Sequence, residues 1–298
     1  SRRWTWSTGW KPKTQHCSHS GSKCHRQSSR WLALPDVLLP LVDLPGVAES
    51  TASARERVDA LLWDRSLRTK GSTLRTDVAL QNARASAAID GIEIALAAWA
   101  SGHAFDDSPL GHAAAGIWRL EEGLSEQLAV WPNAPMQSLA RMHTLVARDV
   151  IADKDSLGRP RGGDTVDDPL RIKSVPDVAS MKVRLAGLAG VITAESEVPA
   201  MVQAAVVHGE LIALRPFEWG SSLIARAASR IVLAQRGLDP DFLLMTDAAI
   251  YSIGRPAYVD AVRAYLTGTP DGVARWIRFC AESCAVGARL SIDRLAQL

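Results

Sequence analysis

The sequence predicts an all-α fold. Apolar residues recur at helical spacing along most of the chain, and almost no segment alternates apolar and polar residues as a half-buried strand would. Gly and Pro gather in one region, residues 153–176, which interrupts the helical pattern. With 298 residues, 47% of them hydrophobic, the chain is long enough for one large domain or two small ones with a sizeable core.

Residues 1–30 differ in composition from the rest of the chain. They hold seven of the 34 basic residues and no acidic one, so the remainder carries 27 basic and 32 acidic side chains, a net charge of −5. An acidic body gives no electrostatic reason to expect nucleic-acid binding, which only the basic tail would favour. We expect this Trp- and Ser-rich tail to be disordered or to be non-native leader sequence.

Cysteine and histidine give two candidate metal sites, both weak. The tail contains a cluster whose spacing fits no two-pair zinc pattern (His16, Cys17, His19, Cys24 and His25). Cys280 and Cys284 lie four residues apart on an expected helix and face the same way. They are suited to pairing or to a metal, but we favour the interpretation that they are small buried apolar groups. The sequence therefore predicts no metal site.

An apolar run, WLALPDVLLPLVDLPGVA at 31–48, contains three prolines and two aspartates. These residues exclude an uninterrupted membrane-spanning helix and the apolar centre of a signal peptide. We interpret the run as an extended segment laid over the globule, and we expect no membrane association and a cytoplasmic location.

Helices are expected from residue 53 onward. The stretch ARERVDALLWDRSL places Val58, Leu61, Leu62 and Leu67 on one face. A second helix spans roughly 77–99 with a break at Gly91, and a third covers about 110–130 and ends before a Trp-Pro pair. We assign residues 31–130 to an N-terminal part made of the extended segment and these helices.

Residues 131–298 form the second part. It begins with an amphipathic helix, PMQSLARMHTLVARDV, followed by the Gly- and Pro-rich segment, which we expect to be a loop with a short hairpin. Further helices are expected at 177–194, 198–214, 221–236, 256–266 and 270–293.

One interhelical break carries the chemical signal. In HGELIALRPFEWGSSLIARAASR, residues 208–230, an apolar helix ends near Pro216, and a second helix begins after Gly220 with Ser221 or Ser222 as a natural N-cap. The start of a buried helix offers free N–H groups and a partial positive charge, which suit a phosphate, and Arg226 lies one turn further in. A capped corner with a surface arginine gives the same pattern, so these residues alone leave both interpretations open.

This stretch resembles the signature loop of the Fic (Fido-domain) family, H-P-F-x-[D/E]-G-N-G-R-x-x-R. Pro216, Phe217, Gly220 and Arg226 match at their expected positions. The resemblance covers about 135–285, including SIGRPAYVDAVRAYLTGTPDGVARWIRF, which is similar to the family's closing helices. It implies a Fic-type helical domain with a short β-hairpin flap, preceded by N-terminal helices. In that family the loop binds a nucleotide, and most members transfer AMP from ATP to a protein hydroxyl.

The segment LGRPRGGDTV, residues 157–166, resembles the family's flap, which aligns the target protein. The resemblance implies flap positions at Gly158, Arg159 and Arg161. The target protein of this chain is unknown.

The loop departs from the family at the positions that carry the chemistry. Arg215 replaces the catalytic His, and a guanidinium has no acceptor lone pair, so Arg215 is not expected to act as a base. Trp219 replaces the acidic metal ligand and offers Mg²⁺ no oxygen, which makes Mg²⁺ binding doubtful. Leu223 replaces the first motif Arg, whereas Ser221 and Ser222 retain hydrogen-bonding capacity.

Two nearby residues do not restore these groups. Glu218 is adjacent to the metal-ligand position but requires the loop to shift by one residue. His208 precedes Arg215 by seven residues, about 10 Å along a helix, which is too far for it to serve as the base.

An inhibitory motif is also suggested upstream. ASAAIDG, residues 85–91, resembles the family's inhibitory helix, [S/T]-x-x-x-E-[G/N], through Ser86, Asp90 and Gly91. The resemblance implies that Asp90 pairs with Arg226 and displaces the γ-phosphate, although Asp is one methylene shorter than Glu. An Ala-rich helix that ends in Asp-Gly is also commonplace, and both interpretations stay open.

Three functions follow, in order of preference. The first is binding of ATP, ADP or another phosphorylated ligand through Gly220, Ser221, Ser222 and Arg226 without AMP transfer. The second is a nucleotidyl or phosphoryl transferase of altered mechanism, in which Arg215 stabilises charge on the leaving group. The third is a non-catalytic interaction protein that takes an extended peptide along the flap groove.

Overall fold

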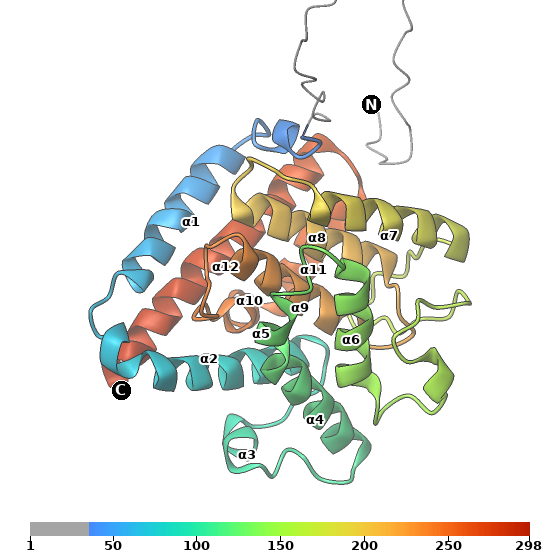
Figure 1. Cartoon of the computed structure of the whole chain (residues 1–298), viewed down its shortest axis with the longest axis horizontal. Helices are drawn as coiled ribbons and strands as arrows, with labels where there is room; N and C mark the ends of the chain where they lie inside the picture. Colours follow the sequence, from blue (N-terminus) through green and yellow to red (C-terminus); the bar gives the residue numbers. More distant parts are fainter. Residues whose placement is uncertain (1–35) are drawn as a thin grey trace, which may run out of the picture.

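The computed structural model describes residues 36–298 (Figure 1). The tail of residues 1–30 and its Cys/His cluster lie outside the described residues. Twelve α-helices and two short 3₁₀ turns make up the described chain. In order they are η1 (Leu39–Leu41), α1 (Val47–Leu62), α2 (Leu67–Ile89), α3 (Leu96–Ser101), α4 (Pro109–Glu122), α5 (Leu124–Gln127), α6 (Pro135–Ala147), η2 (Lys154–Ser156), α7 (Val178–Thr193), α8 (Ala200–Leu214), α9 (Ser221–Gln235), α10 (Thr246–Ile253), α11 (Arg255–Leu266) and α12 (Pro270–Gln297).

Helices α8 and α9 form the centre of the molecule. Every residue of α8 from 201 to 214 is buried, as expected of a helix that is apolar on all sides. Helix α12 crosses α8 at Gly209, where a Cβ atom would lie 2.9 Å from Trp276 Nε1 of α12 and 2.8 Å from the Tyr265 ring of α11. This close crossing lets Trp276 Nε1 donate to the Ala205 carbonyl at 2.7 Å. The α8–α9 loop therefore connects two helices that are both packed in the core.

The N-terminal helices pack against the C-terminal ones. Figure 1 shows α1 (blue) lying along α12 (red), and α2 lies against α10. Ala54, Val58 and Leu61 recur at intervals of three and four and form the buried stripe of α1. Asn82 of α2 is buried and joins α2 to α10: its Oδ1 accepts from the Asp247 N–H at 3.1 Å, and its Nδ2 donates to the Leu244 carbonyl at 2.9 Å. Helix α2 is thereby fixed beside the core.

Most expected helices occur with shifted ends. The helix expected at 77–99 begins ten residues earlier, as α2, and stops at Ile89, with Gly91 at φ 88° in the break before α3. The helix expected at 110–130 is divided into α4 and α5. Helix α10, only eight residues long, was not predicted. The segment expected to be extended forms consecutive turns over residues 37–46, and Leu38 and Leu41 are buried.

The prediction of a β-hairpin flap is wrong, because no strand occurs in residues 36–298. Arg171 and Lys173 have φ values of 54° and 69°, which lie outside the β region. The backbone N–H groups of Arg161 and Asp167 donate instead to the Pro216 and Glu218 carbonyls, at 2.7 and 2.8 Å. At these two positions the segment pairs with the α8–α9 loop and not with a second strand of its own.

No helix within residues 36–298 combines the length and the apolar character needed to cross a bilayer.

Candidate functional site

The α8–α9 loop is a tight turn with a left-handed residue at each end. Arg215 ends α8 at φ 41°, and Gly220 precedes α9 at φ 76°. Within the turn, the Ser221 hydroxyl accepts from the Phe217 N–H and donates to the Phe217 carbonyl, both at 3.0 Å. Phe217 is buried, so the turn is anchored by one apolar side chain and one hydroxyl.

The start of α9 differs from the expected serine cap. Gly220 occupies the N-cap position and offers no side chain, so the prediction of a Ser221 or Ser222 cap is wrong. Ser221 bonds back into the turn, whereas the Ser222 hydroxyl donates to the Asp90 carboxylate. The charge of Asp90 therefore lies beside the first turn of α9, where the helix dipole favours an anion.

Arg226 is fully buried and is held by the end of α2. Its Nε donates to Ser86 Oγ at 2.8 Å, and its Nη2 donates to the Ser86 carbonyl at 3.0 Å. The same Nη2 lies 3.1 Å from Asp90 Oδ1, in an ion pair whose two side chains are 0% and 6% exposed. The pair of Asp90 with Arg226 that the motif implied is present in the structure. Gly91 follows in the turn after α2.

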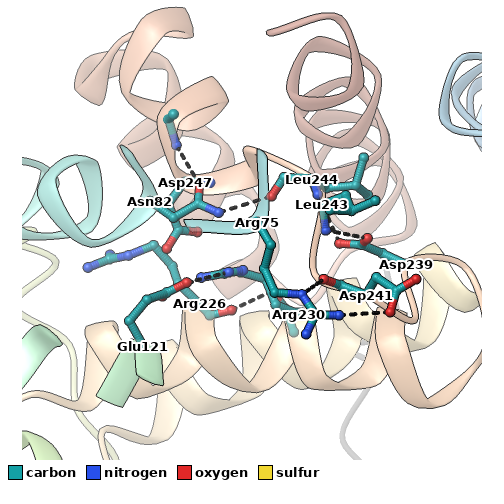
Figure 2. Close-up of polar contacts among 12 residues, drawn as sticks. Arg75, Asn82, Glu121, Arg226, Arg230, Asp239, Asp241, Leu243, Leu244 and Asp247 are labelled. Atoms are coloured by element: carbon teal, nitrogen blue, oxygen red, sulfur yellow. Dashed lines mark hydrogen bonds and ion pairs between the residues drawn. The ribbon is translucent and has the colours of Figure 1, made fainter. Parts of the chain in front are cut away.

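Behind the loop, Arg226 belongs to a larger buried ionic cluster (Figure 2). Arg230, one turn along α9, binds Glu121 of α4 through two hydrogen bonds of 2.6 Å each. Asp247 lies nearby, and its pKa is raised above the ordinary value by burial, against the effect of the two arginines. The pKa of Glu121 is likewise raised by burial. Charged groups from α2, α4, α9 and α10 thus meet in one enclosed region.

Arg215, at the family's histidine position, has both ends of its guanidinium occupied and offers no acceptor for a proton. Its Nη1 lies 3.1 Å from Asp168 Oδ1, and its Nη2 donates to the Ser174 carbonyl. Burial lowers the pKa of Arg215 from its ordinary value, while the neighbouring Asp168 acts in the opposite direction. Both bonds hold the guanidinium against the 168–174 segment.

Of the three expected flap positions, Arg161 makes the most contacts with the loop. Its Nε donates to the Arg215 carbonyl at 3.0 Å, and its two Nη atoms donate to the Gly163 and Pro176 carbonyls at 2.7 and 2.6 Å. Its side chain is fully buried. Arg159 is exposed, and the Gly158 N–H donates to His143 Nδ1 at 2.9 Å. Arg161 thus ties both ends of the 161–176 segment to the turn.

This arrangement of helices is shared with known structures. A Fic family protein from Desulfovibrio desulfuricans G20 superposes with a TM-score of 0.70 at 16% identity, over 85% of this chain and 76% of that one. The chain has the Fic fold. A fragment of Fic-1 from C. elegans matches with a TM-score of 0.67 at 17% identity, over 87% and 75% of the two chains. A variant of that fragment matches with a TM-score of 0.63 at 14% identity, over 87% and 74%. No family model and no curated protein matches the sequence.

At the metal-ligand position of the Fic loop, this chain offers Mg²⁺ no side-chain oxygen atom, because the residue there is Trp219. Within residues 36–298, no three His, Cys, Asp or Glu side chains are arranged to hold a metal ion. Trp219 is partly exposed and has no oxygen ligand, and Glu218 is exposed beside it. The residues present do not fit the ion.

Cys280 and Cys284 are free thiols on α12, and burial raises the pKa of Cys284 to about 12.

His208 is a structural residue of α8. Its Nε2 lies 2.8 Å from the Tyr258 hydroxyl, and its ring meets Trp276 edge-on with centroids 5.0 Å apart. Burial, aided by Arg226, lowers the pKa of His208 to about 3. It is therefore neutral and is packed inside the core.

Sequence reasoning missed His143, which lies directly against the loop. Its ring stacks on Phe217 with centroids 4.2 Å apart. Burial lowers the pKa of His143 to about 4, and Nδ1 accepts the Gly158 N–H, so the neutral ring carries its proton on Nε2. The only signal in the sequence was its place on an amphipathic helix, which does not distinguish it from other core residues.

The acidic residues after the flap were also missed. Asp168 pairs with Arg215 and accepts from the Ile172 and Lys173 N–H groups, at 3.0 and 2.7 Å. Burial and the neighbouring charge of Asp90 raise the pKa of Asp167. Asp90, Asp167 and Asp168 thus place three acidic residues in contact with the loop.

Proposed function

We propose that this chain is a member of the Fic family that binds a nucleotide or phosphorylated ligand without transferring AMP, and that Asp90 holds its phosphate site closed. The observation that supports this proposal is the position of the Asp90 carboxylate, which contacts both Arg226 and Ser222 of α9. A phosphate at this helix N-terminus would use the free N–H groups of its first turn together with the same guanidinium and the same hydroxyl. The carboxylate therefore occupies the position of an anionic ligand.

The geometry of Arg215 argues against transfer. An attacking protein hydroxyl must lose its proton to an acceptor within hydrogen-bond reach. Arg215 offers donors alone, and its guanidinium is bound to Asp168 and the Ser174 carbonyl. His143 is neutral, but it is 1% exposed and stacked beneath Phe217. Neither side chain is placed to accept a proton from a substrate at the loop.

Nucleotide binding then competes with the internal carboxylate. A phosphate that approaches Arg226 meets like charge from Asp90, so wild-type affinity should be low and should rise when Asp90 is neutralised. The absence of an acidic residue at Trp219 predicts that this affinity does not depend on Mg²⁺.

The test is calorimetric titration with ATP and with ADP, with and without Mg²⁺. We compare wild type, Asp90→Asn, which keeps the shape of the side chain, and Asp90→Ala. We expect both variants to bind at least tenfold more tightly than wild type, equally with and without Mg²⁺. The double variant Asp90→Ala/Arg226→Ala removes both members of the buried pair and should not bind, while circular dichroism verifies its fold.

Two results would contradict the proposal. One is the absence of binding in wild type and in both Asp90 variants, each shown to be folded. The other is transfer of labelled AMP from ATP to a protein, which would establish the altered transferase instead.

An interaction function is the second candidate. It is favoured by the internal neutralisation of the loop, because Arg215, Arg226 and Arg230 each already have an acidic partner. Under this alternative the fold serves as a scaffold, and the titrations show no heat in any variant.

A further inference from the structure

A cavity of about 770 Å³ lies between the start of α7, the face of α8 that carries Glu210, and the turn that joins α11 to α12, with η1 at its edge. This volume is within the range of sites that hold small organic molecules. Its walls are mainly apolar: Leu41, Leu44, Val183, Val206, Ala213 and Val273. Val183 is 64% exposed, so apolar surface continues to the mouth of the cavity.

One polar cluster interrupts these apolar walls. Glu210 of α8 is 5% exposed, and its two carboxylate oxygens accept from Arg184 Nη2 at 2.9 Å each. The Tyr265 hydroxyl donates to Glu210 Oε1, also at 2.9 Å. A buried carboxylate is thus fixed in the cavity wall by groups from α7 and α11.

This cluster retains unused hydrogen-bonding capacity. Arg184 makes both of its bonds through Nη2, so its Nε and Nη1 bond to none of the residues 36–298, and its side chain is 33% exposed. Glu210 Oε2 accepts one bond, whereas a carboxylate oxygen has two lone pairs. Donors and a free acceptor position therefore stand side by side.

The charges around the cluster favour a neutral ligand. Glu210 and Asp177 are both acidic lining residues, and they disfavour an anion such as a carboxylate. A cation placed at Glu210 stands beside the Arg184 guanidinium, which already pairs with that carboxylate. A carboxamide carries no charge and therefore avoids both unfavourable contacts. Its carbonyl can accept from Arg184, and its NH₂ can donate to Glu210.

We propose that this cavity binds a small, uncharged, largely apolar molecule that presents a carboxamide group to Arg184 and Glu210. The site is separate from Arg226 and Asp90, so it does not depend on nucleotide binding. It nevertheless shares a wall with the loop: Ser174 and Pro176 line the cavity, and their carbonyls accept from Arg215 and Arg161. A bound molecule would contact the segment that positions Arg215.

The test uses three probes with the same apolar body: 4-phenylbutanamide, 4-phenylbutanoate and 4-phenylbutylamine. Binding is followed by NMR through the methyl resonances of Val206 and Val273. We expect the amide to bind with a dissociation constant of about a millimolar, as suits a ligand of this size. We expect both charged probes to bind at least tenfold more weakly.

Two matched variants localise the site. Ala179 is an exposed residue of α7 that lines the cavity, and Ala179→Trp fills it with an indole. Ala186 is exposed two turns further along the same helix and does not line the cavity, so Ala186→Trp is the control. We expect the amide to lose at least tenfold in affinity with the first variant and less than twofold with the second.

Three outcomes would overturn the proposal. They are binding of either charged probe as tight as that of the amide, amide binding that survives Ala179→Trp, and no methyl shift with any probe at ten millimolar, a concentration on the order of ten times the expected dissociation constant.

Discussion

At the residue scale, Arg230 and Glu121 form the most enclosed two-bond ion pair of the site, with side chains 2% and 8% exposed. Removing one charge from such a pair leaves the other buried and uncompensated, which typically costs about 3–5 kcal/mol. We expect Glu121→Gln to lower the free energy of unfolding in urea by about that amount.

The matched control for this substitution is Glu126→Gln. Glu126 pairs with Arg141 on the surface, with side chains 62% and 59% exposed. Water already solvates these charges, so the loss should be at most about 1 kcal/mol. Equal losses for the two substitutions would contradict the view that burial makes the Arg230–Glu121 pair costly to break.

His143 gives the stability a pH dependence of known sign. Burial lowers its pKa from 6.5 to about 4 in the folded chain. Between these values the unfolded state binds a proton that the folded state does not. The contribution of His143 to the free energy of unfolding is therefore fully present above pH 6.5 and is lost as the pH falls toward 4. His208, with a pKa of about 3, acts in the same direction.

We therefore expect His143→Phe, which keeps a ring stacked on Phe217, to flatten the pH profile. The loss of unfolding free energy between pH 6 and pH 5 should shrink by roughly 1 kcal/mol per pH unit. The slope is the measured quantity, so a constant change in stability caused by the new ring does not interfere. An unchanged slope would show that the folded chain protonates His143 normally.

The residues of the site were predictable where local pattern determines them. Pro216 and Gly220 favour a turn through their backbone geometry, and the motif around Ser86 led to the contact of Asp90 with Arg226. The partners of Arg215 and Arg230 were not predictable, because Asp168 and Glu121 lie 47 and 109 residues away and resemble surface acids in the sequence. Charge pairing over such distances depends on the packing of helices, which the periodicity of one helix does not specify.

At the element scale, the segment between η2 and α7 contains no helix or strand but is well anchored. Arg161 holds it through three backbone carbonyls. We expect Arg161→Met, which keeps the apolar stem and removes the donors, to release this segment. The Asp167 amide, now bonded to the Glu218 carbonyl, should exchange at least tenfold faster.

Arg159→Met is the control for this prediction, because Arg159 is exposed two residues away. It should leave the exchange of Asp167 unchanged. Amides of α12 should keep their protection in both variants, which separates local release from global unfolding. Equal protection of Asp167 in wild type and Arg161→Met would show that the backbone bonds suffice.

The failure of the hairpin prediction has its cause at this scale. Gly and Pro marked a turn-rich segment correctly, but they do not specify a bonding partner. The backbone N–H groups of Arg161 and Asp167 found acceptors in the α8–α9 loop, which a search for local pairing does not consider. Helix α10 was missed for a related reason, because its N-terminus is stabilised by Asn82 from a distant helix.

At the scale of the whole molecule, the all-α class and the central helix pair were predictable, since each long helix carries its own apolar pattern. The division into residues 31–130 and 131–298 stays a prediction. The packing of α1 on α12 and of α2 on α10 suggests a direct test. Without α1 and α2, a fragment of residues 131–298 exposes buried faces of α10 and α12 to water.

We therefore expect this fragment to show helical circular dichroism without a cooperative urea transition. The fragment of residues 36–298 should unfold in a single transition, observed equally by fluorescence and by circular dichroism. A cooperative transition in the shorter fragment would establish residues 131–298 as an independent folding unit.

The arginines around the loop share a feature that bears on how this sequence can change over time. Arg161, Arg215, Arg226 and Arg255 all donate to main-chain carbonyls, including those of Ser86, Ser174 and Ile89. A carbonyl is supplied by whichever amino acid occupies the position, so a substitution at the exposed Ser174 leaves the bond from Arg215 in place. A substitution at Ser86 keeps the carbonyl bond but removes the hydroxyl that accepts from Arg226 Nε. The main-chain bonds of these arginines therefore do not depend on the side chain at the acceptor position, so the shape of the loop can persist while an exposed acceptor residue such as Ser174 changes.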